Sequence, residues 1–220
     1  MTIEPVAFFR SPLKEKFGVP RQAGLAPDLP GEVRFVAPYD VPEALRGLEG
    51  FDYCWLIWGF SMNQGAPFHP TVRPPRLGGN ERVGVFASRS PFRPNGLGLS
   101  CVRITGVAPG VIKVSGGDLA DGTPIYDVKP YVTYADSRPG AASGFVDGSD
   151  WNPLDVEIPE TGAADLPSGS VGALVQVLSQ DPRPQYQEDP ERLYGMVFGE
   201  WNVRFYVRDG KVFVQSVEKC

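Results

Sequence analysis

The chain has 220 residues and a net charge of −5, and 42% of its residues are hydrophobic. This length fits one large globular domain or one domain with a small appendage, and the negative charge argues against nonspecific nucleic-acid binding. The 26 glycines and 23 prolines favour short strands and structured loops over a helical bundle.

Apolar and alternating segments predict a chain made mainly of strands. They lie at residues 3–9, 32–37, 51–63, 82–88, 99–107 and 111–117. The loop between the first two segments is long, and such loops are often functional. Because no regular alternation of strands and helices appears, we expect an antiparallel sheet or barrel instead of a parallel Rossmann-type sheet.

The amino-acid composition of the sequence changes after residue 146. An acidic stretch rich in proline and glycine follows, interpreted as a linker or divergent segment, and residues 171–180 predict a helix. Asp209-Gly210 lies between two alternating runs, which predicts a hairpin with a type I′ turn. We therefore expect two domains, residues 1–146 and residues 147–220, the second a small α+β appendage.

Cysteine and histidine are too few and too scattered for a metal site of the usual kind. Cys54, Cys101 and Cys220 have no CxxC spacing, and His69 is the only histidine, so no metal is expected. The N-terminus lacks a long apolar segment and no run approaches 18 apolar residues. These features predict a cytoplasmic protein with neither a secretion signal nor a membrane span.

The stretch "SRSPFRPNGLGLS", residues 88–100, belongs to a local basic region in an acidic protein. Residues 71–104 hold six arginines and one acid, Glu81. Arginine suits bidentate binding of phosphate or carboxylate, but surface arginines paired with acids elsewhere fit the composition equally well. The Gly-Leu-Gly step lacks the third glycine and the helix of a dinucleotide fingerprint.

The arginine-rich block resembles the TsaA-like family, also called TrmO, of tRNA methyltransferases that act on N6-threonylcarbamoyladenosine. Further motifs in the same order carry the resemblance: "FRSPLKEKFGVPRQAG", "LEGFDYCWLIWGF", "DLADGTPIYDVKPYVTYADS" and "QDPRPQYQ". The resemblance implies a small β-barrel that binds S-adenosylmethionine, a homodimer, and a C-terminal domain that helps to dock tRNA. Family members usually read Pro-Asn-Pro-Ile-Gly where this chain has Gly96-Leu97-Gly98 after Pro94-Asn95, and His-Gln where it has Ser61-Met62.

The resemblance also implies roles for individual residues. The cofactor-binding positions are Gln22, Ala23, Gly24, Ser61, Met62, Arg89, Leu99, Asp118, Leu119, Ala120 and Asp121. Asp118 to Asp121 would otherwise read as a plain hairpin turn. The candidates for contacts with the tRNA substrate are Arg73, Arg76, Arg93, Lys129, Arg183 and Tyr186.

Methyl transfer to nitrogen also requires that a proton leave the acceptor. A carboxylate, a tyrosine or water could take it. The candidates are Asp127, Tyr131 and Tyr134, with Asp136 beside them, although aromatic residues at strand ends usually serve packing. Two other functions remain open: a non-catalytic RNA-binding or S-adenosylmethionine-sensing module of the same fold, and a methyltransferase for a small molecule.

Overall fold

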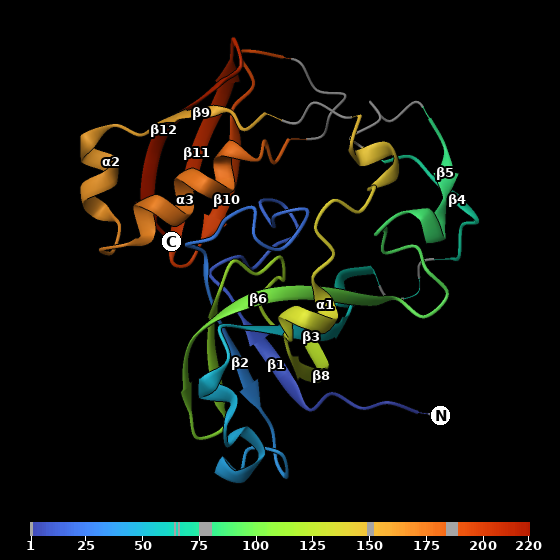
Figure 1. The fold of residues 1–220 in the computed structure, drawn as a ribbon. Coiled ribbons are helices and arrows are strands. Elements are labelled where there is room, and N and C mark those ends of the chain that lie inside the picture. The colour runs from blue at the N-terminus through green and yellow to red at the C-terminus, as the bar shows by residue number, and fades with distance from the viewer. Residues whose placement is uncertain (1, 64, 66, 75–80, 149–151, 184–188) are drawn as a thin grey trace.

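The computed structural model describes residues 2–63, 65, 67–74, 81–148, 152–183 and 189–220. Within them, antiparallel strands close into a barrel in the order β1-β2-β7-β6-β3-β8 (Figure 1). The strands are β1 (Ala7–Arg10), β2 (Pro30–Phe35), β3 (Tyr53–Gly59), β6 (Leu97–Ala108), β7 (Val111–Ser115) and β8 (Pro124–Pro130). The predicted antiparallel barrel is confirmed.

Alternation along the strands builds the interior of the barrel. Cys54, Leu56 and Trp58 on β3 point inward and are at most 7% exposed. They pack against buried residues of the other strands: Ala7, Phe9, Val33, Val102, Ile112, Val114 and Ile125. Burial raises the pKa of the Cys54 thiol to about 12, which makes this cysteine a packing residue and a poor nucleophile at neutral pH.

Short elements connect the strands. They are η1 (Pro42–Leu45), η2 (Leu48–Gly50), η3 (Ser61–Asn63), β4 (Thr71–Val72), β5 (Val83–Gly84), η5 (Val85–Ala87), α1 (Thr133–Asp136) and η6 (Gly144–Val146). The prediction of a strand over residues 82–88 was wrong beyond its first residues. β5 pairs briefly with β4, and the chain then turns into η5, where the Ser88 hydroxyl donates to the Val85 carbonyl and closes the turn.

The C-terminal part is a sheet in the order β10-β11-β12-β9 that carries helices. Its elements are β9 (Asp155–Glu157), α2 (Glu160–Asp165), α3 (Ser170–Ser179), β10 (Tyr194–Phe198), β11 (Trp201–Arg208) and β12 (Lys211–Lys219). The predicted hairpin joins β11 to β12, and both turn residues, Asp209 and Gly210, have positive φ as a type I′ turn requires. The interpretation of the stretch after residue 146 as a linker missed β9 and α2.

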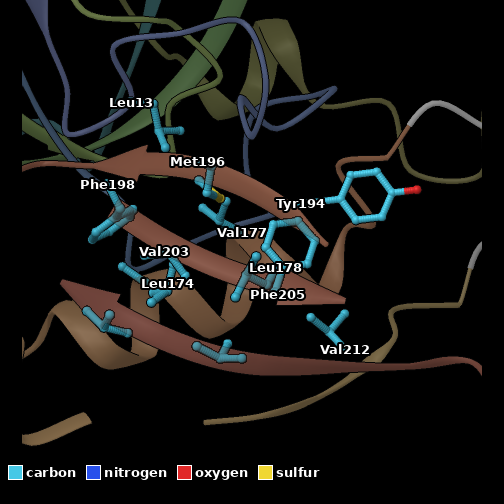
Figure 2. Close-up of a cluster of buried hydrophobic side chains, with 14 of the residues drawn as sticks. Leu13, Leu174, Val177, Leu178, Tyr194, Met196, Phe198, Val203, Phe205 and Val212 are labelled. Atoms are coloured by element: carbon cyan, nitrogen blue, oxygen red, sulfur yellow. The ribbon is translucent and has the colours of Figure 1, made fainter. Parts of the chain in front are cut away.

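A second hydrophobic cluster lies between this sheet and α3, and it includes part of the β1–β2 connection. Leu13, Ala26 and Leu29 are at most 2% exposed within it. Figure 2 draws Leu13 in one cluster with side chains of β10, β11 and α3. The connection between the barrel strands β1 and β2 therefore contributes to the core of the C-terminal part. No helix in the described part of the chain is long and apolar enough to cross a membrane.

Candidate cofactor site

A buried hydrogen-bond chain links the barrel interior to the segment that follows β7. Trp58 Nε1 donates to Ser100 Oγ over 2.9 Å, and the Ser100 hydroxyl donates to Asp118 Oδ1 over 2.5 Å. The Trp58 indole packs directly against the backbone of Gly98, where a Cβ would come within 2.3 Å of the ring. The absence of a side chain at this position therefore makes room for the indole. Asp118 is thereby fixed at one end of the barrel.

The carboxyl of Asp118 has a raised pKa. Burial is the largest cause, and it is opposed by hydrogen bonds from Ser100 and from the Asp118 and Ala23 backbone N–H groups and by the charge of Arg89. A partly buried carboxylate that accepts several hydrogen bonds beside a cation has its position fixed by them.

Arg89 and Gln22 form the outer part of the same cluster. Arg89 Nη1 donates to Gln22 Oε1 over 2.5 Å. Gly24, at φ +83°, donates its N–H to the Gly116 carbonyl over 2.8 Å, which ties this part of the loop to the end of β7. The structure thus brings together Gln22, Ala23, Gly24, Arg89 and Asp118, which are far apart in the sequence.

The rest of the segment after Asp118 has mainly structural contacts. Leu119 and Ala120 are at most 7% exposed as whole residues, so the structure leaves little of either residue open to a ligand. Asp121 pairs with Arg10 over 3.5 Å and accepts the Ser11 N–H over 3.1 Å. Its carboxylate therefore holds the chain where β1 ends.

The structure does not bring the three remaining cofactor candidates, Ser61, Met62 and Leu99, into this cluster. Ser61 and Met62 form η3, which neighbours the β1–β2 connection because Lys16 Nζ donates to Asn63 Oδ1 over 3.3 Å. Leu99 is 54% exposed, and alternation along β6 turns its side chain away from the face that carries Ser100.

The candidates for the proton acceptor gather on the outer face of β8, β3 and β6. Asp127 is paired across the sheet with Ile57, and Ile57 with Leu99, so these three side chains share a face. Asp127 and Lys129 form an ion pair of 2.9 Å. The Tyr131 ring packs 5.9 Å from that of Trp55, whereas Tyr134 on α1 is 90% exposed.

Asp136 serves to anchor α1. Its Oδ2 accepts the Trp55 Nε1–H over 3.1 Å and the Val132 N–H over 2.8 Å. These hydrogen bonds lower the pKa of Asp136, the Val132 N–H being the larger cause. A carboxylate with a lowered pKa and two donors already bound is a poor proton acceptor.

The substrate candidates have different surroundings. Arg93 Nη1 donates to the carbonyls of Ser88 (2.6 Å) and Val85 (3.2 Å), and its guanidinium lies 5.7 Å from the Phe86 ring. Arg183 makes two hydrogen bonds with Asp181, of 2.8 and 2.9 Å. Arg73 is exposed, and Arg76 and Tyr186 lie outside the described residues.

Sequence reasoning missed Ser100 and Trp58, the two residues that orient Asp118. Ser100 lies 18 positions from Asp118, and Trp58 lies 42 positions from Ser100, so no local pattern indicates these contacts. Among the described residues, no group of three or more His, Cys, Asp or Glu side chains is arranged to hold a metal ion.

Comparison with known proteins covers both parts of the chain. Residues 8–137 match the model of the tRNA-methyltransferase O N-terminal domain, and residues 153–220 match that of the TrmO C-terminal domain. The chain belongs to the TrmO family.

Relatives of known name agree over nearly the whole length. The chain is 39% identical to the tRNA (adenine(37)-N6)-methyltransferase of Escherichia coli, covering 98% of this chain and 97% of that protein. It is also 39% identical to a putative S-adenosylmethionine-dependent methyltransferase of Pseudomonas aeruginosa, covering 93% and 92%. A crystal structure of TrmO from Pseudomonas aeruginosa matches with a TM-score of 0.82 at 35% identity, covering 99% and 98% of the two chains.

Gly96, one of the two positions where the sequence differs from the pattern that carries the resemblance, has a positive φ. Its φ is +57°, which a proline at this position could not adopt. The Gly96 carbonyl accepts the Phe60 N–H over 2.9 Å, which joins this turn to the start of η3. The two departures from the family pattern, Gly96 and Ser61-Met62, are therefore neighbours in space.

Proposed function

We propose that this protein transfers a methyl group from S-adenosylmethionine to N6 of the threonylcarbamoyladenosine beside the anticodon in tRNA. The supporting observation is the conjunction of two findings. Both parts of the chain match TrmO models, and the candidate residues Gln22, Arg89 and Asp118 meet in one hydrogen-bonded cluster. As part of this proposal, we place the protein in the cytoplasm.

The chemistry of this cluster suits the proposed cofactor. The guanidinium of Arg89 would bind the cofactor's carboxylate, and the Asp118 carboxylate would accept hydrogen bonds from its hydroxyl or amino groups. The backbone at Gly24 allows close approach, because a Cβ there would meet no atom within 4 Å. Bound S-adenosylmethionine would supply a methyl group already activated on a sulfonium.

The protein's own task is then to position the acceptor and to remove its proton. Leu99 and Asp127 lie two strand spacings apart on one face, about 10 Å between backbones. A substrate held over β3 would pass its proton to Tyr131, or to Asp127 once the substrate has drawn Lys129 away from the Asp127 carboxylate. The exposed Tyr134 is the third candidate, and positioning of this kind can contribute about 7–11 kcal/mol to lowering the barrier.

We assign the arginines to the tRNA. Anticodon loops expose phosphates and splayed bases, which proteins contact with arginines and aromatic rings. Arg73 is exposed for such a contact, and Arg93 presents its guanidinium beside the exposed Phe86 ring. Lys129 is 62% exposed beside Asp127 and would meet the threonyl carboxylate or a phosphate. Arg183 would act from the C-terminal domain, taken as residues 147–220.

A methyl-transfer assay tests the function. We expect labelled methyl to pass from S-adenosylmethionine to tRNA that carries threonylcarbamoyladenosine, and not to the unmodified transcript. Cofactor binding without transfer would reject the catalytic proposal in favour of a sensing module, and equal transfer to both tRNAs would reject the proposed acceptor.

We further propose that the protein is a homodimer. Large apolar side chains to which no other role is assigned are exposed in the single chain, among them Phe68 at 50% and Phe51 at 38%. Burying them against a second copy would remove this apolar surface from water. Light scattering on the purified protein should give about twice the mass of 23.9 kDa, and a monomer mass at micromolar concentration would contradict the proposal.

A further inference from the structure

The β1–β2 connection, residues 11–29, carries Gln22, Ala23 and Gly24 and is packed onto the C-terminal sheet. Phe17 stacks against Tyr194 and Phe205, with ring centroids 6.4 and 6.3 Å apart. Gly18 fits against Met196, whose Cε would lie 2.5 Å from a Cβ at this position. The conformation of the connection is therefore determined in part by the C-terminal domain.

Polar contacts to the C-terminal domain stand on both sides of residues 22–24. Before them, Arg21 Nη2 donates to the Asp181 carbonyl over 3.5 Å. After them, Asp28 and Gln176 of α3 share two hydrogen bonds. The Asp28 N–H donates to Gln176 Oε1 over 2.8 Å, and Gln176 Nε2 donates to Asp28 Oδ2 over 2.7 Å.

The barrel holds the same three residues from the other side. The Gly24 N–H donates to the Gly116 carbonyl, and the Ala23 backbone N–H lies close enough to the Asp118 carboxyl to lower its pKa. Residues 22–24 are thus fixed between Asp118 on one side and the C-terminal domain on the other. A loop held in its binding conformation before the ligand arrives loses less conformational entropy on binding.

We propose that Asp28 and Gln176 are positioning residues, through which α3 of the C-terminal domain holds Gln22, Ala23 and Gly24 in the conformation that binds the cofactor. This inference rests on the proposed function, since it takes residues 22–24 to contact S-adenosylmethionine. It gives the C-terminal domain a role in cofactor binding, separate from any contact with tRNA.

The substitution Gln176→Glu tests the proposal because it replaces the donor Nε2 by an oxygen that faces Asp28 Oδ2. The two carboxylates repel each other and one hydrogen bond is lost, while the helix propensity of the position hardly changes. We expect the Kd for S-adenosylmethionine, measured by calorimetry without tRNA, to rise about 3–10-fold. The kcat at saturating cofactor should stay the same, because the loop reaches the same bound conformation.

The double variant Asp28→Asn/Gln176→Glu provides the rescue. The new amide donates to the new carboxylate, so the lost hydrogen bond is restored with its donor and acceptor exchanged, and the bond from the residue 28 N–H is kept throughout. We expect the Kd to return to within about twofold of the original value. Gln215→Glu is the matched control, because it makes the same chemical change at an exposed position of β12 in the same domain.

The outcomes separate this inference from the proposed function. If the unmodified protein fails to bind S-adenosylmethionine, the proposed function fails first. If it binds and Gln176→Glu leaves the Kd unchanged, or if the double variant binds no better than Gln176→Glu, the positioning role is wrong. Should Gln176→Glu not fold, Gln176→Ala takes its place, with an expected rise in Kd of about 2–5-fold and faster hydrogen exchange at residues 22–24.

Discussion

Arg89→Ala should raise the Kd for S-adenosylmethionine about 10–100-fold, which corresponds to the loss of one hydrogen bond to a charged group. Arg89 is the cation beside Gln22 and Asp118. Its guanidinium donates a hydrogen bond to Gln22, and its positive charge lowers the pKa of Asp118, which burial raises. Under the proposed function, removing Arg89 takes away the partner for the cofactor's carboxylate, and it also removes the hydrogen bond to the Gln22 side chain. Titration calorimetry without tRNA measures the effect directly.

The same variant should change the pH dependence of cofactor binding. Asp118 must be ionised to accept hydrogen bonds with both oxygens, so binding weakens as the pH falls through its pKa. That pKa is already raised above 3.8 by burial, and Arg89 is among the groups that lower it. Without Arg89 the pKa of Asp118 rises further, and the loss of binding at acid pH should begin at a higher pH than in the unmodified protein.

Arg46→Ala is a suitable control for both measurements. Arg46 is an exposed arginine beside η1 that pairs loosely with Glu43, 3.8 Å away. Its removal makes the same change of charge without touching Gln22 or Asp118, so the Kd should stay unchanged. An unaltered Kd in Arg89→Ala, or an equal change in both variants, would remove Arg89 from the site.

Much of the fold could be predicted because local patterns report burial. The aromatic, mostly apolar composition of the segment 51–63 predicted β3, and Asp209-Gly210 predicted the hairpin of β11 and β12, since each signal lies within a short stretch of sequence. The prediction of a strand over residues 82–88 was wrong because it too depended on a local pattern alone. These residues alternate like a strand, but β5 pairs for only two residues before Gly84 leads into η5.

The stretch after residue 146 shows a second limit of local patterns. β9 is a strand of three residues that pairs in parallel with β12, more than 50 positions later. Its apolar residue Val156 gains its packing from that distant strand. Composition alone describes such a segment as a linker, because nothing within it is periodic enough to indicate burial.

The residues of the candidate site also differ in whether the sequence could predict them. The resemblance to a family supplied Gln22, Arg89 and Asp118, and the structure brings them together. The residues that fix Asp118 were missed, because Ser100 looks like any polar strand residue until Trp58 and Asp118 fold against it. Leu99 shows the reverse case, since a position named by resemblance points to the opposite face of β6.

The fit of Trp58 against Gly98 leads to the second large effect. Gly98→Ala should lower the free energy of unfolding by about 1–3 kcal/mol, the usual cost of overpacking a well-packed interior. A Cβ at this position would lie 2.3 to 2.6 Å from three atoms of the indole ring, so the ring must move. Moving it disturbs the hydrogen bond from Trp58 to Ser100, and through Ser100 the orientation of Asp118. The variant should therefore also bind S-adenosylmethionine more weakly.

Gly84→Ala and a double-mutant cycle separate this cause from a general effect of replacing glycine. Gly84 has φ −59° and no atom within 4 Å of a Cβ, so alanine fits there and stability should hold or rise by about 0.4–1 kcal/mol. In the background of Trp58→Phe, which removes part of the obstructing ring, Gly98→Ala should cost less by at least about 0.5 kcal/mol. Urea unfolding measures the free energy of unfolding of the original protein, the two single variants and the double variant. Strict additivity would mean that the clash with Trp58 is not the source of the cost, and that Gly98 stabilises the barrel through its backbone alone.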